Sequence, residues 1–578
     1  MAGTGVLRWL DEPSAGRGIR FSAPDGTWRH LGYPELAESS RRAAAALHEV
    51  GVRPGDTVAM VSAGGPDFVG VLFGALLLGA YPAPLAPPQR LAGTDGYADR
   101  LCATVDSIAP TVVVPDPAHR TVVAAALAVG DPVAAGQAAP ASAGCAGVAA
   151  GSAGVARTRP VCRDSAELVG HATVWDRPPA AGGGLVQTTS GSGGTRKAVR
   201  IPLDALAANI AAIRSWLGMS GATATASWLP VHHDMGLIGC LLTPIVDGSD
   251  LTLMTPGEFV HRPLRYLALF SGDGAAHTAM PAFGLAHLLR RVGDEQLAAL
   301  DLTGWRSLIV GAERVDAELL TAFAGRLRRC GFDPRALLPA YGLAEATLAV
   351  TGARVTATWS SVRVDAASVA PGRAVRLTDD ADGLPVVGCG GPLDAVTVTI
   401  VDAEGRPVPV GQVGEIVVQS PGLAAGYLTA AGELSADAGT TGGTRFQAGR
   451  LHTADAGFLH QGQLYVLGRL GDSLKVRGRT VFAEDVEAAL VAGGVPRHRL
   501  AALLGARDGV PSAVVVLEQP ERAWVEVAQR ELRRLADGAR STVISARPRT
   551  IARTSSGKPR RRELWDLLIT NRLGRETT

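Results

Sequence analysis

Short apolar runs alternate with helix-length segments along most of this chain, and this alternation constrains the fold more than any other feature of the sequence. An apolar run at Thr57–Val61 is followed by a helical pattern from Pro66 to about Gly79. Strand-like runs recur at Thr111–Val114 and Ser307–Val310. Apolar strands separated by helices are typical of parallel sheets, because the crossover helices bury both faces of the sheet. We therefore predict an α/β fold of mostly parallel sheets covered by helices.

The pattern changes near residue 470. Three short strands between residues 501 and 545 flank one clear helix, Trp524–Leu535. The 578 residues of the chain exceed the roughly 250–300 residues that a single hydrophobic core supports. We predict a large N-terminal domain over residues 1–469 and a small, mobile α+β domain over residues 470–578.

Residues 130–184 differ from the rest of the predicted large domain. They are dominated by Ala, Gly and Ser and show little periodicity. Such composition is typical of loops, so we expect a surface excursion and assign no helix or strand there.

Charge, cysteines and hydropathy exclude several classes of protein. Lys and Arg number 56 against 54 Asp and Glu, a net charge of +2, which gives no electrostatic case for a nucleic-acid partner. The six cysteines include no Cys-x-x-Cys pair, as expected of reduced thiols. The most apolar run, around Val69–Ala80, is too short to span a bilayer, and the first residues do not resemble a signal peptide. We expect a cytoplasmic protein without stable membrane insertion.

A Gly- and Ser-rich segment, Thr188–Lys197, has the composition of a phosphate-binding loop. Small residues let the backbone approach a polyphosphate, and hydroxyl and N–H groups donate to its oxygens. Lys197 adds a positive charge. The spacing is not that of a Walker A loop, and a flexible linker explains the composition equally well.

Two adjacent histidines followed by an aspartate lie in the second motif, Ser227–Gly236. Consecutive side chains point apart and no third ligand lies at metal spacing, so a metal site is the weaker interpretation. A loop that places the His233 imidazole on a substrate is the stronger one, and a structural histidine is the remaining alternative.

Three further segments carry polar residues that each have an ordinary explanation. Tyr341–Thr347, preceded by Gly311–Glu313, contains a carboxylate that any surface supplies. Leu451–Phe458, followed by Gly468-Arg469, contains an aspartate of the kind that binds ribose hydroxyls, although single aspartates are common. Thr554–Lys558 lies in a basic stretch that a solvated tail would also show.

In their order and spacing, these five motifs resemble the adenylate-forming superfamily of acyl-CoA synthetases, peptide-synthetase adenylation domains and luciferase. The resemblance extends from about Ile19 to about Leu567. Ser227–Gly239, Tyr341–Leu348 and Pro87–Leu91 are similar to the fatty acyl-AMP ligase branch.

The extended stretch Thr351–Val387 lies where those ligases carry an insertion that acyl-CoA synthetases lack. In the family, the insertion is linked to poor use of free CoA. A surface loop without such a role is the alternative.

The resemblance implies a role for each matching residue. Lys558 would stand between the substrate carboxylate and the α-phosphate, Glu345 would bind Mg²⁺, and His233 would line the mouth of the acyl site. Tyr341 and Gly342 would flank the adenine and α-phosphate. The other residues expected to bind ATP are Thr189, Ser190, Gly191, Ser192 and Lys197 at the phosphates, Asp455 and Arg469 at the ribose, and Gly311, Ala312, Glu313 and Leu343.

The implied activity is ATP-dependent conversion of a carboxylic acid, probably fatty in the branch it resembles, to acyl-AMP for transfer to a separate acyl carrier protein. Carrier proteins are usually acidic, and the arginines Arg560–Arg562 are candidates for docking one. The alternatives are an acyl-CoA synthetase, an enzyme that adenylates an aryl, amino or unusual acid, and an idle member that only binds a carrier protein.

Four positions depart from the family pattern. Gly193 replaces a hydroxyl residue of the phosphate loop, which removes about 1.5–3 kcal/mol of hydrogen bonding to a charged group. Ala454 replaces the usual Gly before Asp455. Gly471 replaces the usual hinge Lys, and His232 stands where Tyr is frequent. These departures bear on the identity of the acid more than on the class of reaction.

Overall fold

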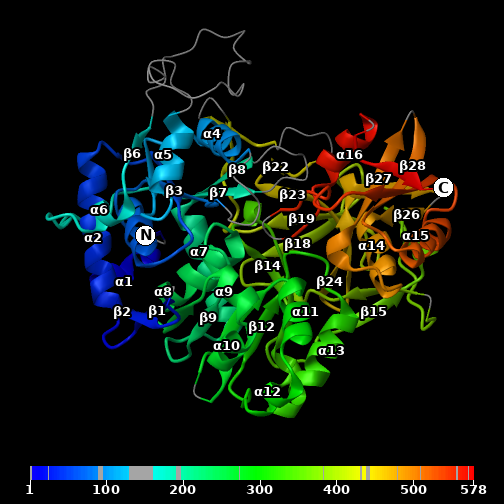
Figure 1. The fold of residues 1–578 in the computed structure, drawn as a ribbon, viewed down its shortest axis with the longest axis horizontal. Helices are drawn as coiled ribbons and strands as arrows, with labels where there is room; N and C mark the ends of the chain where they lie inside the picture. The colour runs from blue at the N-terminus through cyan, green and yellow to red at the C-terminus, as the bar shows by residue number, and fades with distance from the viewer. Residues whose placement is uncertain are drawn as a thin grey trace, which may run out of the picture.

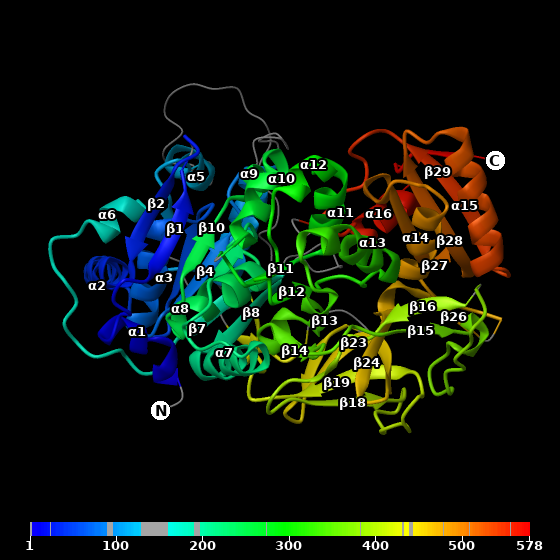
Figure 2. The ribbon, with the colours of Figure 1, turned by 90° about the horizontal axis from the view of Figure 1, so that it is seen from below.

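The computed structural model describes most of the chain (Figures 1 and 2). The described residues are 3–23, 25–88, 96–128, 160–189, 197–272, 274–381, 383–429, 433–437, 443–477, 479–507, 509–554, 557–570 and 572–577. Ser190, Gly191 and Ser192, together with Gly193 and residues 89–91, lie outside these ranges.

The first sheet is fully parallel and has the order β4-β3-β5-β6. Its central strand β3 is buried on both faces: Val58 and Met60 pack in one hydrophobic core with helices α2 and α3, and Ala59 and Val61 pack in another with helix α4. This is why the strand reads as a continuous apolar run. The elements are α2 (Tyr33–Glu49), β3 (Thr57–Val61), α3 (Pro66–Leu77), β4 (Tyr81–Leu85), α4 (Tyr97–Ile108), β5 (Val112–Pro115), α5 (Arg120–Ala128) and β6 (Val161–Cys162).

The second sheet has nine strands in the order β17-β14-β13-β12-β11-β9-β10-β1-β2. Its interior pairs are parallel and its outer pairs are antiparallel. The strands are β1 (Gly18–Ser22), β2 (Trp28–Gly32), β9 (Thr225–Ser227), β10 (Leu251–Leu253), β11 (His277–Met280), β12 (Ser307–Val310), β13 (Leu337–Gly342), β14 (Ala349–Gly352) and β17 (Gly391–Pro392). The neighbouring helices include α7 (Leu203–Leu217), the π-helix η2 (Met235–Leu242), α8 (Thr243–Asp247), α11 (Ala282–Arg291) and α13 (Ala317–Leu327).

Two antiparallel sheets complete the large part, and the sequence pattern did not predict them. One has the order β21-β20-β8-β7, and the other is built on the long strand β23. Their strands are short and meet partners distant in sequence, so no local pattern marks them. They are β7 (Gly184–Thr189), β8 (Lys197–Pro202), β18 (Thr397–Val401), β19 (Gly414–Gln419), β20 (Gly426–Leu428), β21 (Leu434–Ser435), β22 (Arg445–Gln447), β23 (Arg450–His460) and β24 (Gln463–Arg469).

The segment after Arg469 forms two small sheets covered by helices, at the opposite end of the molecule from β1 and α2 (Figures 1 and 2). Two hydrophobic cores here contain residues of this part alone. The predicted strands and helix are confirmed, with longer bounds. The elements are η8 (Leu470–Asp472), β25 (Ser473–Val476), β26 (Arg479–Phe482), α14 (Ala483–Ala492), β27 (Leu500–Arg507), β28 (Val510–Glu518), α15 (Arg522–Leu535), β29 (Arg540–Ala546), α16 (Arg561–Ile569) and β30 (Arg575–Thr577).

The expectation that residues 130–184 carry no secondary structure is wrong for the described residues from 160 onward. Strand β6 pairs with β5, and α6 (Ser165–Val169) begins at Asp164, whose carboxylate accepts a hydrogen bond from the N–H of Ala166. Elements of two and five residues are too short to produce a periodic pattern. Residues 130–159 lie outside the described ranges.

The helices in the described ranges include none with both the length and the apolar character needed to cross a bilayer.

Candidate active site

A cavity of about 1660 Å³ lies between the large part and the small C-terminal part of the chain. Most of the predicted site residues line it, although they come from segments up to several hundred residues apart. They are Thr189, Lys197, His233, Ala312, Glu313, Tyr341, Gly342, Leu343, Glu345, Asp455, Arg469 and Lys558. Gly311 lies beside this cavity, on the wall of a smaller one described below.

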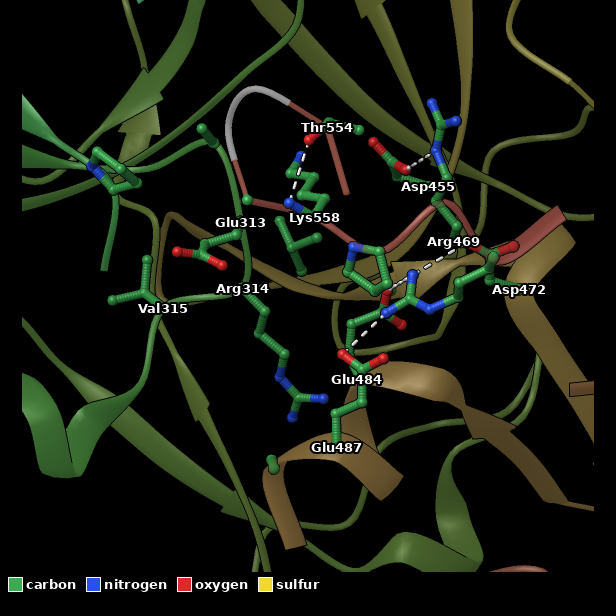
Figure 3. A pocket seen from close by; sticks show the side chains of 18 of the residues that line it. Glu313, Arg314, Val315, Asp455, Arg469, Asp472, Glu484, Glu487, Thr554 and Lys558 are labelled. Carbon is green, nitrogen blue, oxygen red and sulfur yellow. Dashed lines mark hydrogen bonds and ion pairs between the residues drawn. The ribbon is translucent and has the colours of Figure 1, made fainter. Parts of the chain in front are cut away.

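Lys558 enters the cavity from the small part, where it faces Glu313 and Arg469 of the large part (Figure 3). A tight turn holds it: its N–H donates to Thr554 Oγ1 (3.1 Å), and the N–H of Thr554 donates to its carbonyl (2.8 Å). The side chain reaches the solvent of the cavity but is enclosed by protein. This enclosure lowers the pKa of Lys558, and the nearby Glu313 carboxylate opposes the shift. The arrangement is that of a site residue rather than a solvated tail.

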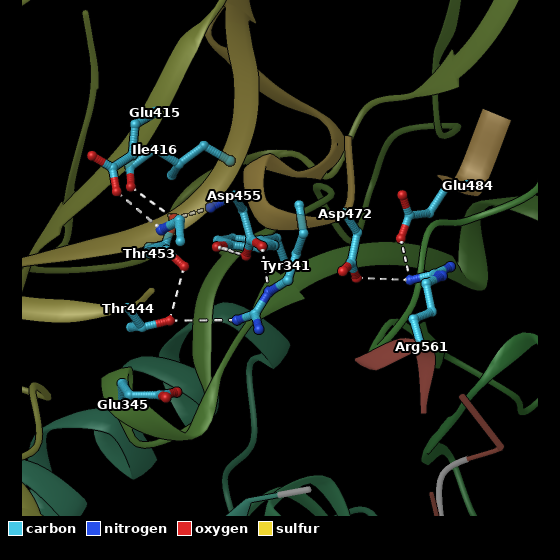
Figure 4. Close-up of polar contacts among 12 residues, drawn as sticks. Tyr341, Glu345, Glu415, Ile416, Thr444, Thr453, Asp455, Asp472, Glu484 and Arg561 are labelled. Carbon is cyan, nitrogen blue, oxygen red and sulfur yellow. Dashed lines mark hydrogen bonds and ion pairs between the residues drawn. The ribbon is translucent and has the colours of Figure 1, made fainter. Parts of the chain in front are cut away.

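Asp455 is the centre of a polar network on β23 (Figure 4). Tyr341 Oη donates to its Oδ2 (2.7 Å), and Arg469 Nε donates to its Oδ1 (3.2 Å). Arg469 pairs with Asp455 across β23 and β24, and Asp455 raises the pKa of Arg469. Burial, reinforced by Asp455, raises the pKa of Tyr341 well above its ordinary value. Tyr341 therefore remains a neutral donor, and the aspartate is held in one orientation.

Ala454 adopts a left-handed backbone conformation, with φ of +60°. This explains the glycine usual in the family, because the conformation costs a non-glycine residue roughly 1–2 kcal/mol. The N–H of Ala454 donates to Glu415 Oε1 (3.1 Å), and both Glu415 oxygens accept from Arg445 (3.2 and 3.3 Å). Glu415 thus holds the strained residue before Asp455. The sequence gave no signal for this role, because Glu415 lies outside every motif.

Glu345 is buried, only 7% exposed, so the surface-carboxylate interpretation is wrong. Its Oε1 accepts from Tyr427 Oη (2.7 Å). Lys197 Nζ lies 5.8 Å from the centroid of the Tyr427 ring. Burial lowers the pKa of Lys197, and the Glu345 carboxylate opposes that shift. A carboxylate and a lysine therefore flank one side of the cavity, next to the ends of the segment 190–196.

Asp234 is a site residue that the sequence analysis passed over. It lies beside His233 on the cavity wall, and its carboxylate accepts from the N–H of Met235 at the start of η2 (2.8 Å). Burial raises the pKa of Asp234, while Lys558 lowers it. The π-helix that follows is a rare element and is frequent at functional sites.

The prediction that Arg560–Arg562 form a docking surface is wrong for Arg561. Its guanidinium contacts Asp472 (3.1 Å), Glu484 (2.9 Å) and Glu487 (3.1 Å) and is mostly buried. These contacts tie α16 to α14 and to the segment after Arg469. Arg562 instead lines the cavity and lowers the pKa of Lys197, which adds a positive charge that the sequence did not indicate.

Gly471, at the predicted hinge, has no packing requirement for glycine. A Cβ added there would meet no heavy atom within 4 Å. The family's lysine would therefore fit, and the difference concerns freedom of the backbone rather than space.

Replacing Tyr341 by phenylalanine should raise the KM for ATP about tenfold, the lower end for a lost hydrogen bond to a charged group of about 1.5–3 kcal/mol, because water in the cavity partly replaces the hydroxyl. Steady-state kinetics at saturating acid measure this change. Tyr465→Phe is the matched control, since the Tyr465 hydroxyl lies 3.3 Å from Ser360 Oγ and the residue does not line the cavity. Equal KM values for wild type and Tyr341→Phe would contradict a nucleotide site at Asp455.

Comparison with known proteins agrees with this geometry. Residues 12–428 match the family model described as AMP-binding enzyme. The medium-chain-fatty-acid–[acyl-carrier-protein] ligase TtuA of Teredinibacter turnerae is 32% identical over 415 residues, which are 67% of this chain and 63% of TtuA. The match thus spans less than two thirds of that relative. The long-chain-fatty-acid–AMP ligase FadD26 of Mycobacterium marinum is 32% identical over 66% of this chain and 69% of its own length.

A solved structure extends the likeness over the whole chain. It comes from structural and functional studies of fatty acyl-adenylate ligases from E. coli and L. pneumophila. Its TM-score is 0.81 at 26% sequence identity, with 99% of this chain and 98% of that chain covered. The predicted α/β fold and the resemblance to fatty acyl-AMP ligases are confirmed, and the chain belongs to the AMP-binding enzyme family.

Proposed function

We propose that this protein converts a fatty acid and ATP to acyl-AMP and pyrophosphate, and passes the acyl group to the thiol of a separate carrier protein. One observation carries the proposal: Lys558 of the small part and the Tyr341–Asp455–Arg469 network of the large part line the same cavity. The relatives named as fatty-acid–carrier-protein and fatty-acid–AMP ligases support the choice of acid and acceptor.

In the proposed reaction, a carboxylate oxygen of the acid attacks the α-phosphorus of ATP. The new bond forms as the bond from the α-phosphorus to the bridging oxygen of pyrophosphate breaks, and pyrophosphate leaves with that electron pair. The step requires positioning and neutralisation of spreading negative charge rather than an acid or base. Lys558 supplies the charge at the α-phosphate, Lys197 acts at the leaving phosphates, and Asp455 holds the ribose.

The donor set of the cavity fits Mg²⁺. This ion is typically held by one or two carboxylates together with substrate phosphates, and Glu345 supplies a buried carboxylate beside Lys197. Bound Mg²⁺ would neutralise charge on the phosphate oxygens. Glu345 remains our proposal for its protein ligand.

The acceptor follows from the contacts of the stretch 351–387. Its strands β15 (Ser361–Val364) and β16 (Leu384–Val387) form a separate two-stranded sheet. The N–H of Thr480, in the small part, donates to the carbonyl of Val369 (2.8 Å). Val364, Val369 and Val386 share a hydrophobic core with Phe482 of the small part. The stretch therefore packs on the element that must rotate if a thiol is to reach the adenylate.

Arg314 adds a polar tie at the same place. Its guanidinium donates to the Pro385 carbonyl of the stretch (3.1 Å) and forms a buried ion pair with Asp485 on α14. Breaking a buried ion pair costs about 3–5 kcal/mol, because it leaves an uncompensated charge. Rotation of the small part would have to break this pair, which disfavours the open arrangement needed by a diffusing thiol.

We expect the enzyme to accumulate acyl-AMP with ATP and acid, to transfer poorly to free CoA, and to acylate a phosphopantetheinylated carrier protein. Parallel product assays by mass spectrometry, with CoA and with carrier protein after a confirmed acid is supplied, measure both outcomes. Omitting ATP is the control for non-enzymatic transfer. Efficient formation of acyl-CoA would reject this acceptor and favour an acyl-CoA synthetase. The boundary between domains at 469/470 and the cytoplasmic location remain predictions of the sequence.

A further inference from the structure

A second cavity, of about 90 Å³, opens beside the nucleotide network and extends along the central sheet. Its mouth is formed by Gly311, Ala312, Tyr341 and Gly342 at the carboxyl ends of β12 and β13. A Cβ at Gly342 would lie 1.9 Å from the Leu348 carbonyl oxygen, so only glycine permits this close approach. The cavity therefore begins where the acid must present its carboxylate.

The far end of this cavity is closed by the indole of Trp216, near the end of α7. The indole N–H donates to the carbonyl of Ala353 (2.8 Å). Its ring lies on the backbone of Gly352, where an added Cβ would be 2.2 Å from Cζ2. Trp216 is half-buried, so it separates the cavity from solvent, and it is fixed from two directions.

The register of the sheet gives the depth of the cavity. Gly342 at the mouth pairs with Ala349, and the N–H of Ala353 beside Trp216 donates to the carbonyl of Pro339. Pro339 precedes Gly342 by three residues, about 10 Å of strand. Three extended residues contain nine backbone atoms, so an acyl chain of about nine atoms spans the same length. The volume agrees, because at about 10–15 Å³ for each water-sized group it holds about six to nine such groups.

The deep wall favours an uncharged tail. Asp234 is the charged residue of the lining, and it lies at the mouth beside Lys558. At the deep end, the His277 ring nitrogens contact Thr223 Oγ1 (2.7 Å) and Ser307 Oγ (2.8 Å). Burial lowers the pKa of His277 to about 4, so the ring is neutral at physiological pH. A charged tail would find no partner among the described residues of this wall.

We infer that Trp216 sets the chain length of the acid and that the substrate is a medium-chain fatty acid of about six to nine carbons. The inference rests on the proposed function and adds the substrate class.

Pyrophosphate release with saturated acids of four to sixteen carbons tests this inference. Wild type should prefer octanoate over dodecanoate at least tenfold in kcat/KM, since one methylene that does not fit costs 10-fold or more. Trp216→Ala should raise the kcat/KM for dodecanoate at least tenfold and move the optimum to longer acids. Trp175→Ala is the matched control, because Trp175 lies against His48 and outside both cavities.

A second variant keeps the test decisive if Trp216→Ala does not fold, as judged by circular dichroism. An added Cβ at Gly239, on the cavity wall, would lie 3.1 Å from the flexible end of Leu348, so Gly239→Ala should narrow the cavity and move the optimum to shorter acids. Comparable wild-type use of octanoate and hexadecanoate, or unchanged length profiles in both variants, would overturn the inference alone. Absence of pyrophosphate release with every acid would overturn the proposed function, and this inference with it.

Discussion

Replacing Lys558 by alanine is expected to reduce the rate of acyl-adenylate formation by about 10²–10³-fold or more, the scale of losing one preorganised charge-stabilising donor. The ammonium group is the charge that the small part of the chain brings into the cavity beside Glu313 and Asp455. Its loss leaves the spreading charge at the α-phosphate without this partner. Single-turnover measurement of acyl-AMP, with ATP and a confirmed acid, gives the rate directly.

ATP binding should survive the same substitution, because the Tyr341–Asp455–Arg469 network lies in the large part and remains intact. Isothermal titration of ATP separates binding from chemistry. Lys475→Ala is a suitable control, since Lys475 is an exposed lysine on β25 and does not line the cavity. A Lys558→Ala enzyme that forms acyl-AMP at the wild-type rate would show that this lysine has no role in the step.

Glu345→Gln is expected to lower activity by about 10²-fold at ordinary Mg²⁺, with partial recovery as Mg²⁺ is raised. The amide keeps the shape of the side chain but removes the negative charge that a hard cation requires. The substitution also removes the carboxylate that opposes the lowered pKa of Lys197, so less of that lysine remains charged. Activity measured against Mg²⁺ concentration for both enzymes gives the shift.

Tyr427→Phe distinguishes metal binding from a structural role of Glu345. It removes the hydroxyl that donates to Glu345 (2.7 Å) but keeps the ring beside Lys197. If Glu345 only accepts this hydrogen bond, both variants should behave alike. If it binds Mg²⁺, Tyr427→Phe should retain the wild-type Mg²⁺ dependence, and an unshifted curve for Glu345→Gln would count against the ligand role.

The sequence predicted the class of fold because helix and strand periodicities are local. Thr57–Val61 and Ser307–Val310 form β3 and β12 with the predicted bounds. The short strands between residues 397 and 469 were missed, since their antiparallel pairing depends on partners distant along the chain. The same reason explains β6 and α6, which are ordered by packing on β5 and on helix α2 rather than by their own pattern.

The sequence by itself determined the family and most of the residues that line the cavity, because motif order and residue type are written along the chain. Only the tertiary structure paired Tyr341 with Asp455 across 114 positions, assigned Glu415 to the strained Ala454, and committed Arg561 to three carboxylates. It also placed Trp216 across the end of a short cavity. These features depend on which distant backbones approach one another, and no local spacing encodes the distance between two side chains brought together by packing.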